Sequence, residues 1–130
     1  LPVLKPNEAM IDDAVATGAR IGLVATFAPT LASMRAEFPA GTDVRMALAE
    51  GGLEALRAGE PAQHDQLVAE RAAALVAEGC AVIALAQFSM ARAASKVARH
   101  TRTPVLTTVG SAVRRLRERV ESAGDAGGAF

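Results

Sequence analysis

The stretch CAVIALAQFS, residues 80–89, decides how the rest of the chain is interpreted. Its apolar part, residues 81–86, ends at the polar residue Gln87, and Phe88 and Ser89 then lead into a helical pattern. A short apolar run without polar alternation is typical of a parallel strand that helices cover on both faces. In open parallel sheets, ligands bind where strands end and helices begin. We therefore expect Gln87, Phe88 and Ser89 to form the floor of a binding site.

The same arrangement, an apolar run followed by a helical pattern, recurs along the chain. Helical segments carry apolar residues three and four positions apart, and glycine or proline marks most of their ends. Strands that alternate with helices indicate an α/β fold, a three-layer sandwich around a mainly parallel sheet of four to five strands. Arg45 interrupts one run, which we expect near a sheet edge. The predicted strands cover residues 1–4, 20–25, 44–49, 81–86 and 104–108.

The length of 130 residues suits one domain with its own core. We expect this domain to cover residues 1–122, with a linking strand and helix in 1–19, the core in 20–108 and a C-terminal helix in 109–122. The Gly-rich residues 123–130 are expected to form a flexible tail. Because the chain opens without methionine and directly in a strand-like run, we expect it to be a piece of a longer protein.

Charge and hydropathy argue against several classes of partner. The 14 Lys and Arg balance the 14 Asp and Glu, and Glu118 and Glu121 interrupt the arginines near the C-terminus, so nothing favours nucleic acid. No apolar run approaches the roughly 20 residues that cross a bilayer, and the first residues do not resemble a signal peptide. The single cysteine excludes an internal disulfide. We expect a cytoplasmic protein without nucleic-acid or membrane partners.

The cysteine and the two histidines are poor candidates for chemistry. Cys80 precedes its strand, at the edge opposite the predicted site, and is expected to be a small buried or half-buried thiol. His64 lies early in a long helix and His100 at a helix end, where a cationic side chain is favourable. Neither histidine has a partner at metal-ligand spacing, so we expect no metal and two surface histidines. The chain contains no dinucleotide or P-loop fingerprint, and no cofactor is expected.

Polar side chains follow each predicted strand. Hydroxyls beside free backbone N–H groups at helix starts bind carboxylates or phosphates. Ser, Thr and Asn also cap helices without binding any ligand, and Asn7 is placed to cap the first helix, so both roles stay open. The predicted substrate-binding residues are Asn7, Thr26, Phe27, Thr30, Gln87, Phe88, Ser89, Thr107 and Thr108.

Four segments carry a resemblance to a known family. They read LPVLKPNEAMIDDAV from residue 1, RIGLVATFAPTLASM from residue 20, EGCAVIALAQFSMARAA from residue 78 and TPVLTTVGSAVRRL from residue 103. In this order and spacing they resemble the second half of proteins in the aspartate/glutamate/hydantoin racemase superfamily.

The resemblance implies an isomerase of amino-acid metabolism that needs no cofactor and forms a dimer. Such proteins have two similar α/β halves that face a cleft, and each half usually supplies one cysteine at a strand end. One thiolate removes the proton α to a carboxylate, and the other thiol delivers a proton to the opposite face. Backbone amides and Thr or Ser hydroxyls at the strand ends hold the carboxylate.

This chain departs from that pattern in two places. The half that normally precedes Leu1, with the first cysteine, is not in the sequence, and the second cysteine position aligns with Gln87. A glutamine amide does not titrate in a useful range and cannot act as a general base, although it can orient a substrate oxygen. We therefore expect a chain that is inactive alone, and its catalytic residues stay unknown.

Three interpretations remain open. The first is the substrate-binding half of a racemase-like enzyme that acts on Asp/Glu-type or related small acids, or of a decarboxylase or cis-trans isomerase of the same superfamily. The second is a small-carboxylate or amino-acid binding module without catalysis. The third is an interaction domain that forms homo-oligomers or associates with the missing half. Its candidate apolar surfaces are Met10, Ile11 and Val15 on the first helix and Leu116 and Val120 on the last.

Overall fold

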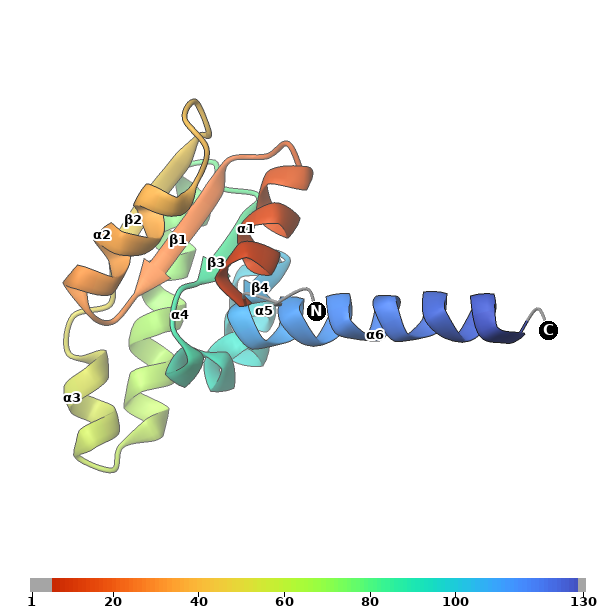
Figure 1. The fold of residues 1–130 in the computed structure, drawn as a ribbon. Helices are drawn as coiled ribbons and strands as arrows, with labels where there is room; N and C mark the ends of the chain where they lie inside the picture. Colours follow the sequence, from red (N-terminus) through yellow and green to blue (C-terminus); the bar gives the residue numbers. More distant parts are fainter. Residues whose placement is uncertain (1–5, 129–130) are drawn as a thin grey trace.

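The computed structural model describes residues 6–128, apart from the side chains of Pro6, Phe88 and residues 122–128. Four parallel strands form one sheet in the order β2-β1-β3-β4, which confirms the predicted α/β class (Figure 1). The strand predicted over residues 1–4 lies outside the described residues. The strands are β1 Ile21–Ala25, β2 Val44–Leu48, β3 Val82–Leu85 and β4 Val105–Thr107.

Helices cover both faces of the sheet and complete the three layers. Helices α1 and α2 contact one face, whereas α4 and α5 pack against the other. A 3₁₀ helix, η1, connects the end of β3 to α5, and α3 forms a hairpin with α4. The bounds are α1 Pro6–Ala16, α2 Ala28–Glu37, α3 Gly52–Arg57, α4 Pro61–Ala77, η1 Phe88–Ala93, α5 Ala94–Thr101 and α6 Thr108–Gly128.

Strand β1 lies inside the sheet and is buried along its whole length. Successive side chains of a strand point to opposite faces, so Leu23 joins the cluster under α1 and α2, whereas Val24 joins the cluster under α4 and α5. Between them, Gly22 lets α4 approach closely: a Cβ at position 22 would lie 3.2 Å from Cβ of Leu75 and 2.8 Å from Cδ1 of Ile83. The apolar strands therefore read without alternation because both faces are covered.

Strand β2 is an edge strand of the sheet, as the charged residue Arg45 within its apolar run indicated. It pairs with β1, and its side chains at Arg45 and Met46 are exposed, the latter to 50%. Arg45 also lies 3.5 Å from Asp43, which in turn accepts a hydrogen bond from Arg20. Charged side chains on an edge strand discourage pairing with another chain.

Two expectations about the first helix are wrong. Asn7 does not cap α1, because the helix already includes Pro6, whose missing N–H and fixed φ suit a first turn. Its side-chain amide instead donates to Glu37 of α2 at 3.4 Å. Met10 and Ile11 are not an uncovered surface, since both are buried against the sheet and only Val15 of that set is exposed.

Helix α6 begins earlier than the sequence suggested. The predicted fifth strand ends at Thr107 rather than Thr108, and Gly110 and Ser111 lie in the first turn of the helix instead of before it. The helix then leaves the body of the molecule and continues to Gly128, beyond the end predicted at residue 122 (Figure 1). The mobility of residues 123–130 stays a prediction.

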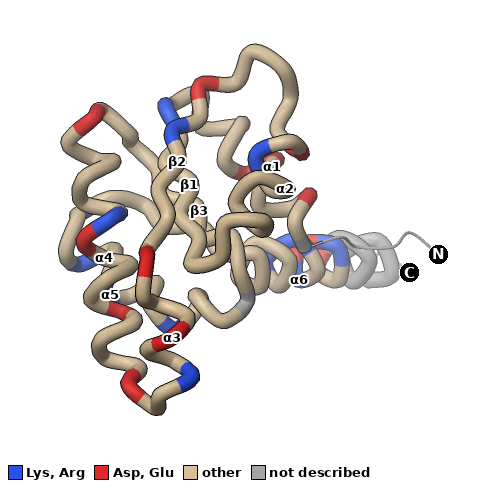
Figure 2. The backbone as a smooth tube through the Cα atoms, turned by 90° about the vertical axis from the view of Figure 1, so that its left-hand side faces the viewer, with Lys and Arg blue, Asp and Glu red and all other residues tan. Residues whose placement is uncertain are grey.

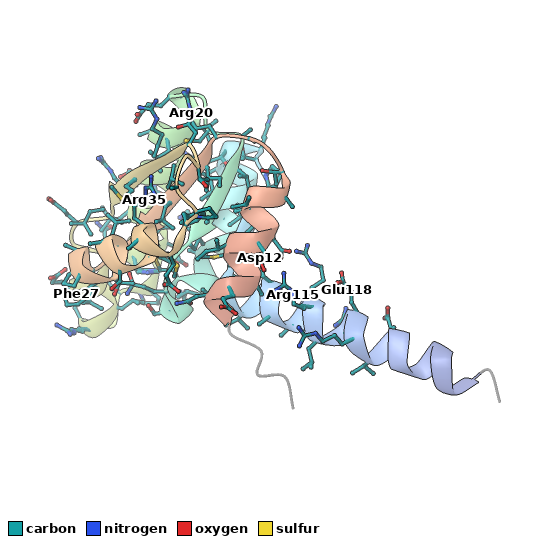
Figure 3. All side chains as sticks on the ribbon, turned by 45° about the horizontal axis from the view of Figure 1, so that its top comes forward. Asp12, Arg20, Phe27, Arg35, Arg115 and Glu118 are labelled. Atoms are coloured by element: carbon teal, nitrogen blue, oxygen red, sulfur yellow. The ribbon has the colours of Figure 1, made fainter. Side chains whose placement is uncertain are left out.

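Two arginines attach α6 to α1. Arg115 donates to Asp12 at 3.2 Å (Figure 3), and Arg114 donates to Asp13. These ion pairs use one side of an otherwise solvated arginine-rich helix. The apolar residues of α6 are exposed, and their exposed fractions rise with distance along the helix from the sheet. Association through these residues stays a prediction. They are Val109, Val113, Leu116 and Val120.

Charges are mixed over the molecule. Figure 2 shows basic and acidic residues interspersed along the backbone rather than gathered in one patch, in keeping with their equal numbers. Within residues 6–128, no helix combines the length and the apolar character that a bilayer crossing requires.

Candidate functional site

The predicted site lies at the carboxyl ends of three neighbouring strands, which finish on the same side of the sheet. Strands β1, β3 and β4 run in parallel, and their register aligns Val24, Leu85 and Thr107 in one row across the sheet. Thr26 and Gln87 follow directly beyond that row. We call this edge the rim: Thr26, Gln87, Thr107 and Thr108. The sequence predicted that these strand ends would converge, and the parallel register brings them together.

A direct hydrogen-bonded link joins Thr26 to Gln87. Oε1 of Gln87 accepts from the backbone N–H of Thr26 at 2.6 Å and from its hydroxyl at 2.9 Å. Thr26 is buried and Gln87 is half-buried. Each bond contributes about 1 kcal/mol net, and shielding from water favours both. We call this pair the Thr26–Gln87 clamp.

The clamp fixes which way the Gln87 amide points. A backbone N–H can only donate, so the oxygen of Gln87 must face Thr26 and its nitrogen must face away. Among the described residues, none accepts a hydrogen bond from that nitrogen. Gln87 thus presents donors, and no acceptor, to the space beyond the strand ends.

The hydroxyls at the end of β4 have different roles. Thr107 caps α6, since its Oγ1 accepts from the N–H of Gly110 at 2.8 Å. The hydroxyls of Thr108 and Ser111 are buried and have no hydrogen-bond partner within the described part of the chain. A buried hydroxyl without a partner is uncommon and marks a position where a ligand or water would complete its bonding. Capping therefore explains Thr107 but not Thr108.

A hollow of about 240 Å³ opens beside the rim, between α1, α2 and the end of β3. Asn7 and Thr30, both predicted site residues, line it together with Ala86, which precedes Gln87. Glu37 lies in the same hollow and accepts the hydrogen bond from Asn7. The described lining therefore mixes polar and apolar side chains, and the charge that it carries is negative rather than positive.

Three remaining predicted residues are less engaged. Phe27 is 47% exposed at the start of α2 (Figure 3), and Ser89 is exposed in η1. The side chain of Phe88 lies outside the described residues. Phe27 takes the N-cap position of α2 without a side-chain capping bond, because a phenyl ring has no acceptor, and Pro29 in the first turn has no N–H that would need one.

Sequence reasoning missed a polar cluster behind the rim that is buried at one end and has a 46% exposed arginine at the other. His64, predicted on the surface, is fully buried, and its Nδ1 lies 2.8 Å from Oδ1 of Asp65. Arg92 of η1 binds both carboxylate oxygens of Asp65, at 3.0 and 3.1 Å. The signal was present, because His64 precedes the buried Val68 by one helical turn and shares its face. We call His64, Asp65 and Arg92 the η1 anchor.

The η1 anchor controls the charge of Asp65 and the position of η1. Burial alone would raise the pKa of Asp65, but hydrogen bonds from Arg92 and His64 outweigh it and lower that pKa, so the carboxylate stays ionised. Because an ionised carboxylate only accepts, Nδ1 of His64 carries the hydrogen. Nε2 is buried without a partner in the described residues. The anchor thereby holds η1, which directly follows Gln87, against α4.

Gly52 separates the η1 anchor from the clamp. A Cβ at position 52 would lie 2.8 Å from Cγ2 of Thr26 and 3.5 Å from Cδ2 of His64. Both side chains therefore border the same small space at the start of α3. The rim and the anchor are adjacent in the fold although 38 positions separate Thr26 from His64 in the numbering.

Cys80 takes no part in the rim. The thiol is buried before β3, at the opposite edge of the sheet, as predicted. Burial raises its pKa, an effect that exceeds the opposing influence of Arg20. We expect Cys80 to react with a thiol reagent at pH 7 at least about a hundredfold more slowly in the native chain than in guanidinium. Equal rates in both states would contradict this placement, and timed alkylation with mass spectrometry measures them.

The rim can bind a polar oxygen but supplies no evident base. Gln87 does not titrate, Thr26 donates to Gln87, and the thiol of Cys80 lies at the other edge. Within the described residues, no group of three or more His, Cys, Asp or Glu side chains could hold a metal ion. The chemistry that the rim residues can supply is hydrogen-bond donation to a small ligand.

Sequence comparison identifies the family of the chain. The Asp/Glu/Hydantoin racemase family matches residues 1–116. The chain belongs to this family. No curated protein sequence matches the chain.

Solved structures of racemases share the fold of this family member. An allantoin racemase from Klebsiella pneumoniae superposes with a TM-score of 0.76 at 26% identity, over 94% of this chain and 51% of that one. An allantoin racemase from Pseudomonas fluorescens superposes with a TM-score of 0.74 at 22% identity, over 95% of this chain and 54% of that one. The chain thus spans about half the length of the racemase structures it matches.

Proposed function

We propose that this chain is a substrate-binding half of a racemase-like enzyme that acts at a carbon next to a carbonyl group. The substrate class is a small Asp/Glu-type acid or a cyclic ureide of the hydantoin and allantoin kind. Family membership and the likeness to allantoin racemases support the reaction class. No cofactor enters the proposal.

One observation carries the proposal: the Thr26–Gln87 clamp joins two strand ends and turns an amide nitrogen outward, and the end of the neighbouring strand carries the Thr108 hydroxyl, which is buried without a partner among the described residues. Donors fixed in advance around a carbonyl oxygen favour the negative charge that grows on it when the neighbouring carbon loses a proton. A rim of donors without a base fits the binding half of such a site.

The described hollow favours a neutral ring over a dicarboxylate. Glu37 contributes a negative charge beside Asn7 and Thr30, and the described lining of that hollow includes no basic side chain. A second carboxylate would therefore meet repulsion rather than an ion pair. Hydantoin and allantoin, which are neutral near pH 7 and rich in carbonyl oxygens, suit the donors of the rim better.

We expect the chain to bind without turnover. A panel of aspartate, glutamate, hydantoin and allantoin is titrated into the chain by calorimetry, and turnover is followed separately by polarimetry and by hydrogen exchange at the reactive carbon in D₂O. The expected result is binding of at least one cyclic ureide with a Kd between about 0.1 and 1 mM and no change in optical rotation. Absence of binding to every compound would reject the proposal, and racemisation by this chain would reject the predicted inactivity.

A binding module without catalysis is the second candidate. The observation that favours it is Gln87 itself, which stands where the family resemblance places a reactive thiol. The variant Gln87→Cys tests this, because a racemase that has merely lost one group regains proton exchange when the thiol returns, whereas a dedicated binding module does not. Association with a second copy or a missing half, and a cytoplasmic location, stay predictions.

A further inference from the structure

We propose that Gln87 is a specificity-determining residue of the rim and that Thr26 positions it, so that the site selects ligands presenting a carbonyl or carboxylate oxygen to the Gln87 nitrogen. This inference rests on the proposed function and names one contact of that site. It assigns Gln87 a role in oxygen recognition, which suits an amide that does not titrate.

The backbone shows that the side chain is free for this role. Gln87 has extended angles, φ −127° and ψ 147°, at the start of η1, and its side chain makes no capping bond to that helix. It reaches instead across the sheet to the end of β1, where Thr26 supplies both hydrogen bonds. The sheet order sets this contact, since β3 lies beside β1.

Reversing the amide is strongly disfavoured. With the nitrogen toward Thr26, two N–H donors would face each other, and the buried backbone N–H would lose its acceptor. The hydroxyl of Thr26 could turn to accept, but the backbone N–H could not. The backbone therefore enforces a donor-only surface, and the threonine hydroxyl reinforces it.

Joining the ends of β1 and β3 does not by itself require a glutamine at position 87. An oxygen acceptor alone would join the two strand ends, yet glutamine also leaves an amide nitrogen at the rim, in a half-buried position without a described acceptor. On the neighbouring strand end, the Thr108 hydroxyl is buried and equally without a partner. A half-buried amide nitrogen at the end of β3 and a buried hydroxyl at the end of β4 are donor groups on adjacent strand ends, and they fit a ligand oxygen.

The test compares variants of the full chain that remove the donor in different ways. Gln87→Glu keeps the length and an oxygen for Thr26 but replaces the outward nitrogen with a charged oxygen. Gln87→Met removes both the donor and the clamp. Gln63→Glu makes the same chemical change at an exposed position of α4 and serves as the matched control.

We expect hydantoin and aspartate, the two probes, to bind Gln87→Glu at least about tenfold more weakly than wild type, with the larger loss for the anionic aspartate. Gln87→Met loses about tenfold for either probe, and Gln63→Glu is unchanged. In ¹H–¹⁵N spectra, the side-chain amide signal that disappears in Gln87→Glu shifts on ligand addition to wild type. The dispersion of the same spectra shows whether each variant is folded.

The positioning role of Thr26 has its own measurement. Thr26→Val removes the hydroxyl bond but keeps the backbone bond, so the Gln87 amide signal is expected to show greater motion and the Kd to rise about threefold. Thr26→Ser restores the hydroxyl and is expected to restore both values. A merely structural threonine would alter thermal stability without this paired change in amide motion and affinity.

The outcomes separate this inference from the proposed function. If wild type binds a probe and Gln87→Glu and Gln87→Met bind it equally well, the inference is overturned and the proposed function stands. If wild type binds neither probe nor any other compound of the panel, both are overturned. Binding that weakens in both Gln87 variants but not in Gln63→Glu supports the two together.

Discussion

Gly22→Val is expected to destabilise the protein by about 3 kcal/mol, enough to lower the melting temperature by roughly 10 °C. The added side chain would enter the contact between β1 and α4, where even a Cβ approaches Cβ of Leu75 at 3.2 Å. The 2.8 Å approach to Ile83 Cδ1 is less costly, because that methyl group can rotate away. The backbone of Leu75 cannot move without shifting α4, and Gly22→Ala should therefore already cost about 1–2 kcal/mol.

Ala81→Val is the matched control for Gly22→Val. Ala81 is exposed just before β3, so its enlarged side chain meets solvent rather than a helix, and the expected change lies within about 0.5 kcal/mol. Thermal and urea unfolding followed by circular dichroism measure all three variants. If Gly22→Val and Ala81→Val have the same melting temperature, α4 does not approach β1 as closely as described.

Asp65→Ala is expected to cost about 2–3 kcal/mol and to loosen η1. The change leaves Nδ1 of the buried His64 without its acceptor and frees both nitrogens of Arg92 from their hydrogen bonds. The exposed pair of Arg20 and Asp43 gives the control, because Asp43→Ala removes a comparable ion pair where solvent screens the charges. We expect Asp43→Ala to change the stability little, and equal effects of the two variants would contradict the η1 anchor.

The pH dependence of the Asp65 contribution has a definite sign. Its pKa is lowered in the folded state, so the stabilisation is complete above the unfolded value of about 4 and is lost as pH falls through the folded value. The difference in unfolding free energy between wild type and Asp65→Asn should therefore be largest near neutral pH and shrink below pH ~4. A difference that grows on acidification would show that Asp65 is not held as an anion.

At the rim, the sequence predicted where the polar side chains lie along the chain but not which hydrogen bonds they form. Gln87 was placed at a strand end because the apolar run before it stops there, which is local information. The orientation of its amide depends on Thr26, and the two are 61 residues apart. Similarly, the capping role of Thr107 was one of two open alternatives until the start of α6 was known.

Errors arose where side-chain partners came from distant segments. Asn7 was predicted to cap a helix, but Pro6 moved the helix start and Glu37 of α2 became its partner. His64 was predicted on the surface, since a histidine in a first helical turn is usually solvated, yet α3 and η1 cover that face of α4. Neither neighbour could be inferred from the local pattern around the residue.

The sequence by itself determined the succession of buried strands and helices, the edge position of β2, the family and the place of Gln87 just beyond β3, although the strand ends at Leu85, one residue earlier than predicted. These follow from apolar periodicity and motif order, which are properties of short segments. Only the tertiary structure decided that Gln87 bonds Thr26, that His64 is buried beside Asp65, and that Met10 and Ile11 are covered. The physical reason is that hydrogen-bond partners and burial depend on which strands become neighbours, and here the order β2-β1-β3-β4 places residues distant in sequence side by side.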